Sequence, residues 1–113
     1  MKYKGSCHCK NIEFEVETNL EKIAQCNCSI CIRRNAKMIM VPKENFTLNK
    51  GESDLALYQF NSNVAKHYFC KKCGIYTHHN RKSDPNGMGV NLGCIEELDA
   101  TEYDPIAFDG RKL

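Results

Sequence analysis

Apolar and polar residues alternate along the N-terminal part of the chain, which is the pattern of a half-buried β-strand. Within Asn11–Thr18, Ile12, Phe14 and Val16 fall on one face and three glutamates on the other. A period of two residues places successive side chains on opposite faces of a sheet. The sequence therefore predicts a strand here, with one buried face and one charged face.

Short apolar runs separated by turn residues continue this pattern over the rest of the chain. Further extended segments are expected at 22–26, 37–41, 46–48, 55–60, 65–69, 75–79 and 88–92. An Asn49-Lys50-Gly51 turn is expected between two of them, and Ser83–Gly87 is expected to form a loop. Residues 29–35 are predicted to form one helical turn capped by Ser29, and residues 95–100 another short helical piece. Short strands at regular spacing favour a mainly β fold, a small all-β domain of packed short antiparallel sheets.

Length and composition bound the kind of protein. A chain of 113 residues with 42% hydrophobic and 27% charged residues predicts one soluble domain, spanning residues 1–113. No apolar run is long enough for a membrane span, and Met1–Lys10 lacks the apolar stretch of a signal peptide, so a cytoplasmic location is expected. In a reducing compartment, eight cysteines favour metal binding over disulfides. A net charge of +2 is too small to imply nucleic acid.

Seven of the eight cysteines fall into three clusters in the sequence, and two of these clusters together make one complete set of four sulfurs. On an extended strand, Cys7 and Cys9 would point to the same side, with His8 pointing away. Cys70-Lys71-Lys72-Cys73 has the spacing of a zinc knuckle, and Gly74 after it can adopt positive φ. The spacing predicts a structural zinc site formed by Cys7, Cys9, Cys70 and Cys73. The alternative is two unrelated pairs of buried thiols.

The third cluster, Cys26-x-Cys28-x-x-Cys31, supplies only three sulfurs. Cys26 and Cys28 are expected on one strand face, and Cys28 and Cys31 on one helical turn. Catalytic zinc sites keep three protein ligands and an open position for water or substrate. The cluster therefore indicates a second, working zinc. The alternatives are a thiol-redox site, or a second structural zinc completed by a distant residue; the candidate fourth ligands are His8, His67, His78, His79 and Cys94.

The ordered motifs resemble those of a known family. They are Gly5-Ser6-Cys7-His8-Cys9, Ile12–Val16, Cys26–Cys31 with Arg33-Arg34, Phe69–Ile75 and Gly89–Leu92. Together they resemble the glutathione-dependent formaldehyde-activating enzyme family, which includes centromere protein V, over roughly residues 2–99. The resemblance implies an all-β zinc-binding fold with two zinc ions. It assigns Cys7, Cys9, Cys70 and Cys73 to the structural ion and Cys26, Cys28 and Cys31 to the catalytic one.

The expected activity follows from the three-sulfur cluster and from this resemblance. The resemblance implies condensation of formaldehyde with glutathione to S-hydroxymethylglutathione, the reverse of a carbon–sulfur lyase reaction. Arg33 and Arg34 are candidates to bind the carboxylates of a glutathione-like thiol, although adjacent helical residues cannot both point one way. The alternatives are a zinc-stabilised module that binds nucleic acid or protein without turnover, suggested by the basic pairs at 33–34, 71–72 and 81–82, and a zinc or thiol buffer.

Overall fold

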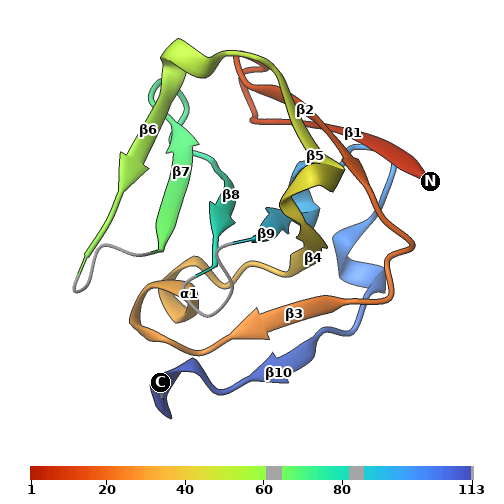
Figure 1. Cartoon of the computed structure of the whole chain (residues 1–113), viewed down its shortest axis with the longest axis vertical. Helices are drawn as coiled ribbons and strands as arrows, with labels where there is room; N and C mark the ends of the chain where they lie inside the picture. The colour runs from red at the N-terminus through yellow and green to blue at the C-terminus, as the bar shows by residue number, and fades with distance from the viewer. Residues whose placement is uncertain (61–64, 82–85, 113) are drawn as a thin grey trace.

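The computed structural model describes residues 1–60, 65–81 and 86–112, and this part of the chain is mainly β, as the sequence predicts (Figure 1). The strands are β1 (Lys2–Ser6), β2 (Glu13–Glu17), β3 (Ile23–Cys26), β4 (Met38–Pro42), β5 (Phe46–Lys50), β6 (Leu55–Tyr58), β7 (Lys66–Cys70), β8 (Tyr76–Asn80), β9 (Gly87–Asn91) and β10 (Ile106–Phe108). The α-helix is α1 (Ser29–Arg34), and the 3-10 turns are η1 (Lys43–Asn45), η2 (Glu52–Asp54), η3 (Leu92–Cys94), η4 (Ala100–Glu102) and η5 (Gly110–Lys112).

The strands form a small sheet and a large one. The small sheet has the order β1-β2-β5, and the large one β10-β3-β4-β9-β8-β7-β6. All of these pairs are antiparallel except β10 and β3, which run parallel with Ile106 opposite Ala24. The expected antiparallel sheets are thus present. The C-terminal strand β10, which lies in a segment where no strand is predicted, is added at one edge of the large sheet (Figure 1).

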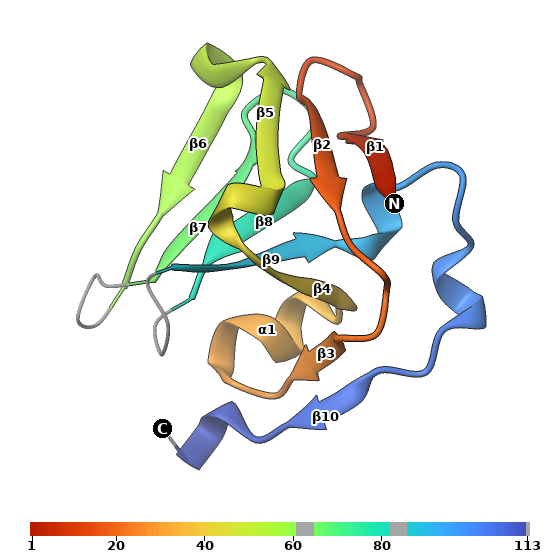
Figure 2. The same cartoon turned by 45° about the vertical axis from the view of Figure 1, so that its right-hand side comes forward.

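The hydrophobic core lies between the two sheets. Phe14 and Val16 of β2 are almost fully buried, as their alternation predicts, and they join one cluster with Ile39 of β4 and Val90 of β9. In Figure 2 the strands β1, β2 and β5 stand side by side, next to β9 and β4. Burying a side chain such as Phe14 stabilises the fold by about 1.5–3 kcal/mol. This packing holds the strands that carry the cysteines in a fixed relation.

Within residues 46–60, the predicted position of the turn is wrong. The strand β5 continues through Asn49 and Lys50, and the chain changes direction at Gly51, whose φ is 94°. A β-carbon at Gly51 would overlap the carbonyl oxygen of Asn11, so only glycine fits. The two predicted strands do not pair with each other, because β5 joins β2 whereas β6 joins β7. Gly51 therefore marks the point where the chain passes from the small sheet to the large one.

Two helical predictions also need correction. The predicted helical piece at residues 95–100 is absent, because residues 95–99 follow η3 as turns and Ala100 is already the first residue of η4. The helix α1 begins at Ser29, but its N-cap residue is Cys28, which makes no side-chain capping bond. The predicted loop at Ser83–Gly87 lies largely outside the described residues, and Gly87 is already the first residue of β9. Among the described helices, none is long and apolar enough to cross a membrane.

Candidate functional site

Four cysteine side chains from two distant parts of the chain converge. Cys7 and Cys9 lie just after β1, whereas Cys70 ends β7 and Cys73 lies in the turn that follows. The sulfurs of Cys7 and Cys9 are 3.6 Å apart, as are those of Cys9 and Cys70, and all four lie within 4.8 Å of one another. Tetrahedral zinc with sulfur ligands at about 2.3 Å would separate the sulfurs by about 3.8 Å. The four thiols therefore fit a metal ion of this kind.

The backbone around these four thiols is arranged to support charged sulfur. The amide of Ile12 lies 3.3 Å from the sulfur of Cys7, and the amides of Lys72 and Cys73 lie 3.4 and 3.5 Å from that of Cys70. Amide donors to a thiolate favour its charged form. Gly74 has a φ of 78° and donates to the carbonyl of Cys70. The predicted positive φ at Gly74 is thus confirmed.

The expected strand geometry of Cys7 and Cys9 is wrong, although their sulfurs do converge. The strand β1 ends at Ser6, and the next residues form a tight turn. In this turn the amide of Lys10 donates to the carbonyl of Cys7 at 3.2 Å, and Lys10 has a φ of 67°. A turn, rather than strand periodicity, brings both sulfurs to one point.

Cys26, Cys28 and Cys31 form a second cluster at the junction of β3 and α1. Their sulfurs also lie within 4.8 Å of one another, and all three residues are half-buried. Cys26 ends β3 and Cys28 precedes α1, so the two do not share a strand face as expected. The amide of Cys28 approaches the sulfur of Cys26 at 3.4 Å. Within the described residues, no fourth Cys, His, Asp or Glu joins this cluster.

The pKa values of Cys28 and Cys31 are shifted in opposite directions. Burial raises the pKa of Cys31. Hydrogen bonds to Cys28 and Cys26, and the negative charge of these two residues, raise it further. Burial also acts to raise the pKa of Cys28, but hydrogen bonds from Cys31, Cys26 and Ile30 outweigh it and lower the pKa. One sulfur is therefore favoured as thiolate at the expense of its neighbour. A divalent cation would remove this conflict by favouring the charged form of all three.

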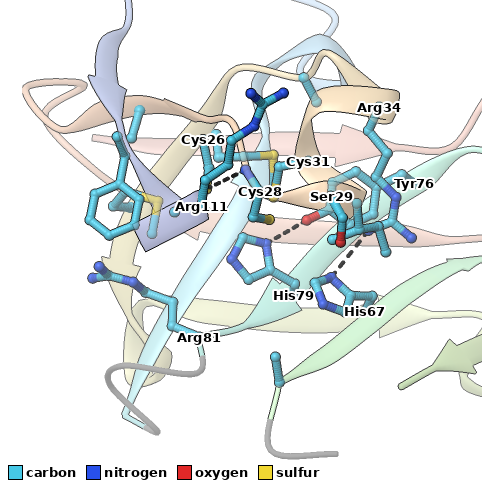
Figure 3. Close-up of a pocket in the computed structure, with 18 of the residues that line it drawn as sticks. Cys26, Cys28, Ser29, Cys31, Arg34, His67, Tyr76, His79, Arg81 and Arg111 are labelled. Atoms are coloured by element: carbon cyan, nitrogen blue, oxygen red, sulfur yellow. Dashed lines mark hydrogen bonds between the residues drawn. The ribbon is translucent and has the colours of Figure 1, made fainter. Parts of the chain in front are cut away.

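The three-thiol cluster opens on a cavity of about 420 Å³ between α1, the large sheet and the C-terminal segment (Figure 3). Its floor is largely apolar. The apolar residues include Ala24, Ile30, Met38, Met40, Phe60 and Phe108. Its charged lining consists of Arg34, Arg81 and Arg111, and no Asp or Glu lines it in the described part of the chain. The cavity therefore favours a small ligand with an apolar part and a negative charge.

Arg34 connects α1 to the histidines of the cavity wall. Its guanidinium carbon lies 3.7 Å from the centre of the Tyr76 ring, and one guanidinium nitrogen lies 3.2 Å from Nδ1 of His67. The Tyr76 hydroxyl in turn forms a hydrogen bond with Nδ1 of His79. Burial lowers the pKa of His67 to about 4, helped by the charge of Arg34, and burial lowers the pKa of His79 to about 3. Both imidazoles are therefore neutral near pH 7.

The C-terminal segment closes one side of the cavity, and Asn27 holds it there. The backbone amide of Asn27 donates to the carbonyl of Phe108. The Asn27 side chain donates to the Asp109 carboxylate at 3.0 Å and accepts from the backbone amide of Arg111 at 3.2 Å. Nε of Arg111 donates to the Asn27 carbonyl. A β-carbon at Gly110 would overlap the sulfur of Cys26. Sequence reasoning missed these residues because their roles depend on the parallel pairing of β10 with β3.

The structure separates the other candidates into those inside the cavity and those outside it. Arg34 lines the cavity, whereas Arg33 donates to the carbonyl of Ser29 and does not line it. Of the candidate fourth ligands, the cavity is lined only by His67 and His79 in the described part of the chain.

The remaining candidates lie elsewhere. His78 points to the opposite face of β8, against Phe46 and Tyr68, at ring-centre distances of 4.4 and 4.7 Å. Cys94 is buried, with its sulfur 3.7 Å from the carbonyl of Tyr76, and His8 is exposed.

A small mainly β domain with two cysteine clusters that could hold metal ions defines the class of this protein. A family model for "glutathione-dependent formaldehyde-activating enzyme" matches residues 2–108. The chain therefore belongs to this family, as its motifs predict. A crystal structure of a Rhodobacter sphaeroides protein is similar to it, with 38% sequence identity and a TM-score of 0.87, and the match covers 95% of this chain and 98% of the other.

Proposed function

We propose that the chain is a zinc-dependent enzyme that forms or breaks the carbon–sulfur bond between a small thiol and an aldehyde. S-hydroxymethylglutathione, or a related thiol conjugate, is the adduct that we infer, and the reaction class is that of a carbon–sulfur lyase. The observation that carries this proposal is the three-thiol cluster at the wall of a cavity of about 420 Å³. The family match supports the same chemistry.

The two clusters would have different roles within one zinc domain of residues 1–113. Cys7, Cys9, Cys70 and Cys73 form a complete donor set for a structural ion. At Cys26, Cys28 and Cys31, a bound zinc ion would supply a Lewis acid that lowers the pKa of a thiol ligand. The three cysteines would hold this ion at the edge of the cavity and leave one position open toward it.

The cavity lining would select and orient the thiol. Glutathione carries two carboxylates, and the cavity has arginines and no described acidic residue in its wall. Arg81 and Arg111 line the cavity, whereas Arg33 bonds to the carbonyl of Ser29 and does not line it. The apolar floor would receive the carbon chain of the thiol and exclude water from the adduct.

Of the three functions predicted from the sequence, the enzyme fits the cavity better than a module that binds nucleic acid. Arg34, one of the basic residues that suggested phosphate binding, turns into the cavity and lies on Tyr76. A cytoplasmic location would supply both the reducing conditions and the glutathione that the proposed chemistry needs.

The test is turnover of S-hydroxymethylglutathione by zinc-loaded protein, with cysteine variants. Cys28→Ser should lose one zinc ion and nearly all activity. Cys94→Ala removes a buried thiol outside both clusters, so this variant should keep its zinc content and its activity. Full activity and full zinc content in Cys28→Ser would contradict the proposal.

A further inference from the structure

His67 and His79 each have one ring nitrogen engaged by the protein and the other accessible from the cavity. Nδ1 of His67 faces Arg34, and Nδ1 of His79 faces the Tyr76 hydroxyl (Figure 3). Neither Nε2 atom has a hydrogen-bond partner among the described residues, and no buried side-chain nitrogen there lacks a partner, so both Nε2 atoms keep some exposure. Because the two rings line the cavity, a ligand in the cavity could reach these atoms.

The contact with Arg34 fixes which nitrogen of His67 carries the proton. A guanidinium group has five N–H donors and no acceptor. Nδ1 of His67, at 3.2 Å from it, must therefore present its lone pair. A neutral imidazole has a single N–H, so in His67 this group is at Nε2.

Tyr76 imposes the same state on His79. Burial raises the pKa of the Tyr76 hydroxyl, which therefore keeps its proton, although the charge of Arg34 acts in the opposite direction. A phenol hydroxyl donates more readily than it accepts, so this proton is directed to the lone pair of Nδ1 of His79. The neutral ring of His79 then also carries its N–H at Nε2.

The two rings are held rigidly beside each other. Their centres are 5.6 Å apart and their planes are inclined by 30°. The ring of His79 lies against Gly89 on the neighbouring strand, where a β-carbon would overlap it. Donors that are fixed before the reaction stabilise developing charge without having to reorganise.

We propose that His67 and His79 form a pair of neutral Nε2–H donors that bind the aldehyde-derived oxygen of the adduct. Arg34 and Tyr76 are positioning residues that set the tautomers of this pair. This inference rests on the proposed function and names the groups that would act on its substrate. It assigns Arg34 to the histidines rather than to a substrate carboxylate.

The reaction balances without an oxidant or reductant. In the direction of synthesis, the thiol sulfur bonds to the aldehyde carbon, and the carbon–oxygen double bond becomes a single bond. Negative charge develops on the oxygen, which finally takes the proton that the thiol has lost. The two Nε2–H groups would stabilise this oxygen by hydrogen bonds and keep their own protons. In the reverse direction the same groups would bind the hydroxyl oxygen as the carbon–sulfur bond breaks.

The tautomers can be measured directly by long-range ¹H–¹⁵N correlation spectra of zinc-loaded protein that contains ¹⁵N-histidine. At pH 7, His67 and His79 should each show a protonated Nε2 and an unprotonated Nδ1. A ring protonated at Nδ1, or at both nitrogens, would overturn the proposal.

Variants separate the positioning residues. Arg34→Gln should shift His67 toward a mixture of tautomers and leave His79 unchanged, whereas Tyr76→Phe should shift His79 and leave His67 unchanged. If Arg34→Gln fails to fold, Tyr76→Phe still decides the question. Lys4→Gln removes a cation from the exposed face of β1 and should change neither ring. Unchanged tautomers in both cavity variants would overturn the role of Arg34 and Tyr76.

Kinetics then test what the donors bind. His67→Phe keeps an aromatic ring but loses the donor, and kcat should fall on the order of 10²-fold with the zinc content and the KM for the thiol unchanged. An unchanged kcat would overturn the role of His67. The failures are distinguishable: inactive wild-type protein with the predicted tautomers would contradict the proposed function, whereas active wild-type protein with a different tautomer would contradict the donor pair alone.

Discussion

Gly110 lies against the thiol of Cys26 so closely that a β-carbon at position 110 would overlap the sulfur. The two residues are far apart in sequence and meet because β10 pairs in parallel with β3, which ends at Cys26. The last turn of the described chain is thereby part of the wall around the three-thiol cluster.

Gly110→Ala should weaken metal binding at the three-thiol cluster. The added methyl group must displace either the Cys26 sulfur or the C-terminal segment, and changes next to metal ligands typically lower affinity about 10–100-fold. Zinc competition with a chromogenic chelator measures this. Gly93→Ala is the matched control, because its β-carbon would meet only the flexible side chain of Asn91, at 3.3 Å. Equal zinc affinity in both variants would contradict the prediction.

Asn27→Ala should loosen the C-terminal segment without unfolding the domain. The variant loses the side-chain bonds to Asp109 and to the amide of Arg111, which together contribute about 1–2 kcal/mol. Amide hydrogen exchange in residues 106–112 should then be about tenfold faster. Asn45→Ala removes a comparable side-chain bond, to the carbonyl of Glu17, and should leave this segment unchanged. Unchanged exchange in Asn27→Ala would show that Asn27 does not hold the segment.

Loss of the four-thiol cluster should destabilise the fold much more than loss of the three-thiol cluster. Cys9→Ser removes a ligand from the four-thiol cluster, which joins the turn after β1 to the end of β7. Because structural zinc contributes about 10–16 kcal/mol in small domains, this variant should be largely unfolded. Cys28→Ser should keep its circular dichroism spectrum and most of its melting temperature. Equal destabilisation by both substitutions would contradict the assignment of one cluster as structural and the other as the working site.

Stability should fall in mild acid because of a buried histidine outside the cavity. Burial of His78 against Phe46 and Tyr68 lowers its pKa to about 4, whereas an unfolded histidine titrates near 6.5. The unfolded state therefore binds more protons between these two values, and the free energy of unfolding decreases as pH falls from about 6.5 to 4. One such group gives a slope of at most about 1.4 kcal/mol per pH unit.

The measurement is urea unfolding of wild type and His78→Phe across this pH range. The variant should show a smaller slope, and zinc release followed in parallel separates the effect of metal loss. The same slope in both proteins would show that protonation of His78 does not cause the loss of stability.

The sequence predicts the fold where local pattern decides it, and fails where pairing between distant segments decides it. The alternation of Ile12, Phe14 and Val16 identifies β2 and its buried face. The turn at Gly51 and the strand β10 depend on which sheet each segment joins, and neither leaves a periodic signal. Gly74 is predicted correctly because positive φ is a local property of glycine.

The candidate site shows the same limit. Cysteine spacing identifies both clusters, because neighbouring ligands of one metal lie close in sequence. The residues around the second cluster come from several separate segments, which include α1, β4, β7, β8 and the C-terminal end. The contacts of Arg34 with Tyr76 and His67 therefore could not be read from the sequence.

The proposed chemistry requires the three-thiol cluster to hold a zinc ion that accepts a thiol. Native mass spectrometry of reduced wild-type and Cys28→Ser protein, with and without glutathione, measures both properties. We expect two zinc ions and a glutathione adduct in the wild type, and one zinc ion without the adduct in Cys28→Ser. A single zinc ion in the wild type, or an equal glutathione adduct in both proteins, would contradict it.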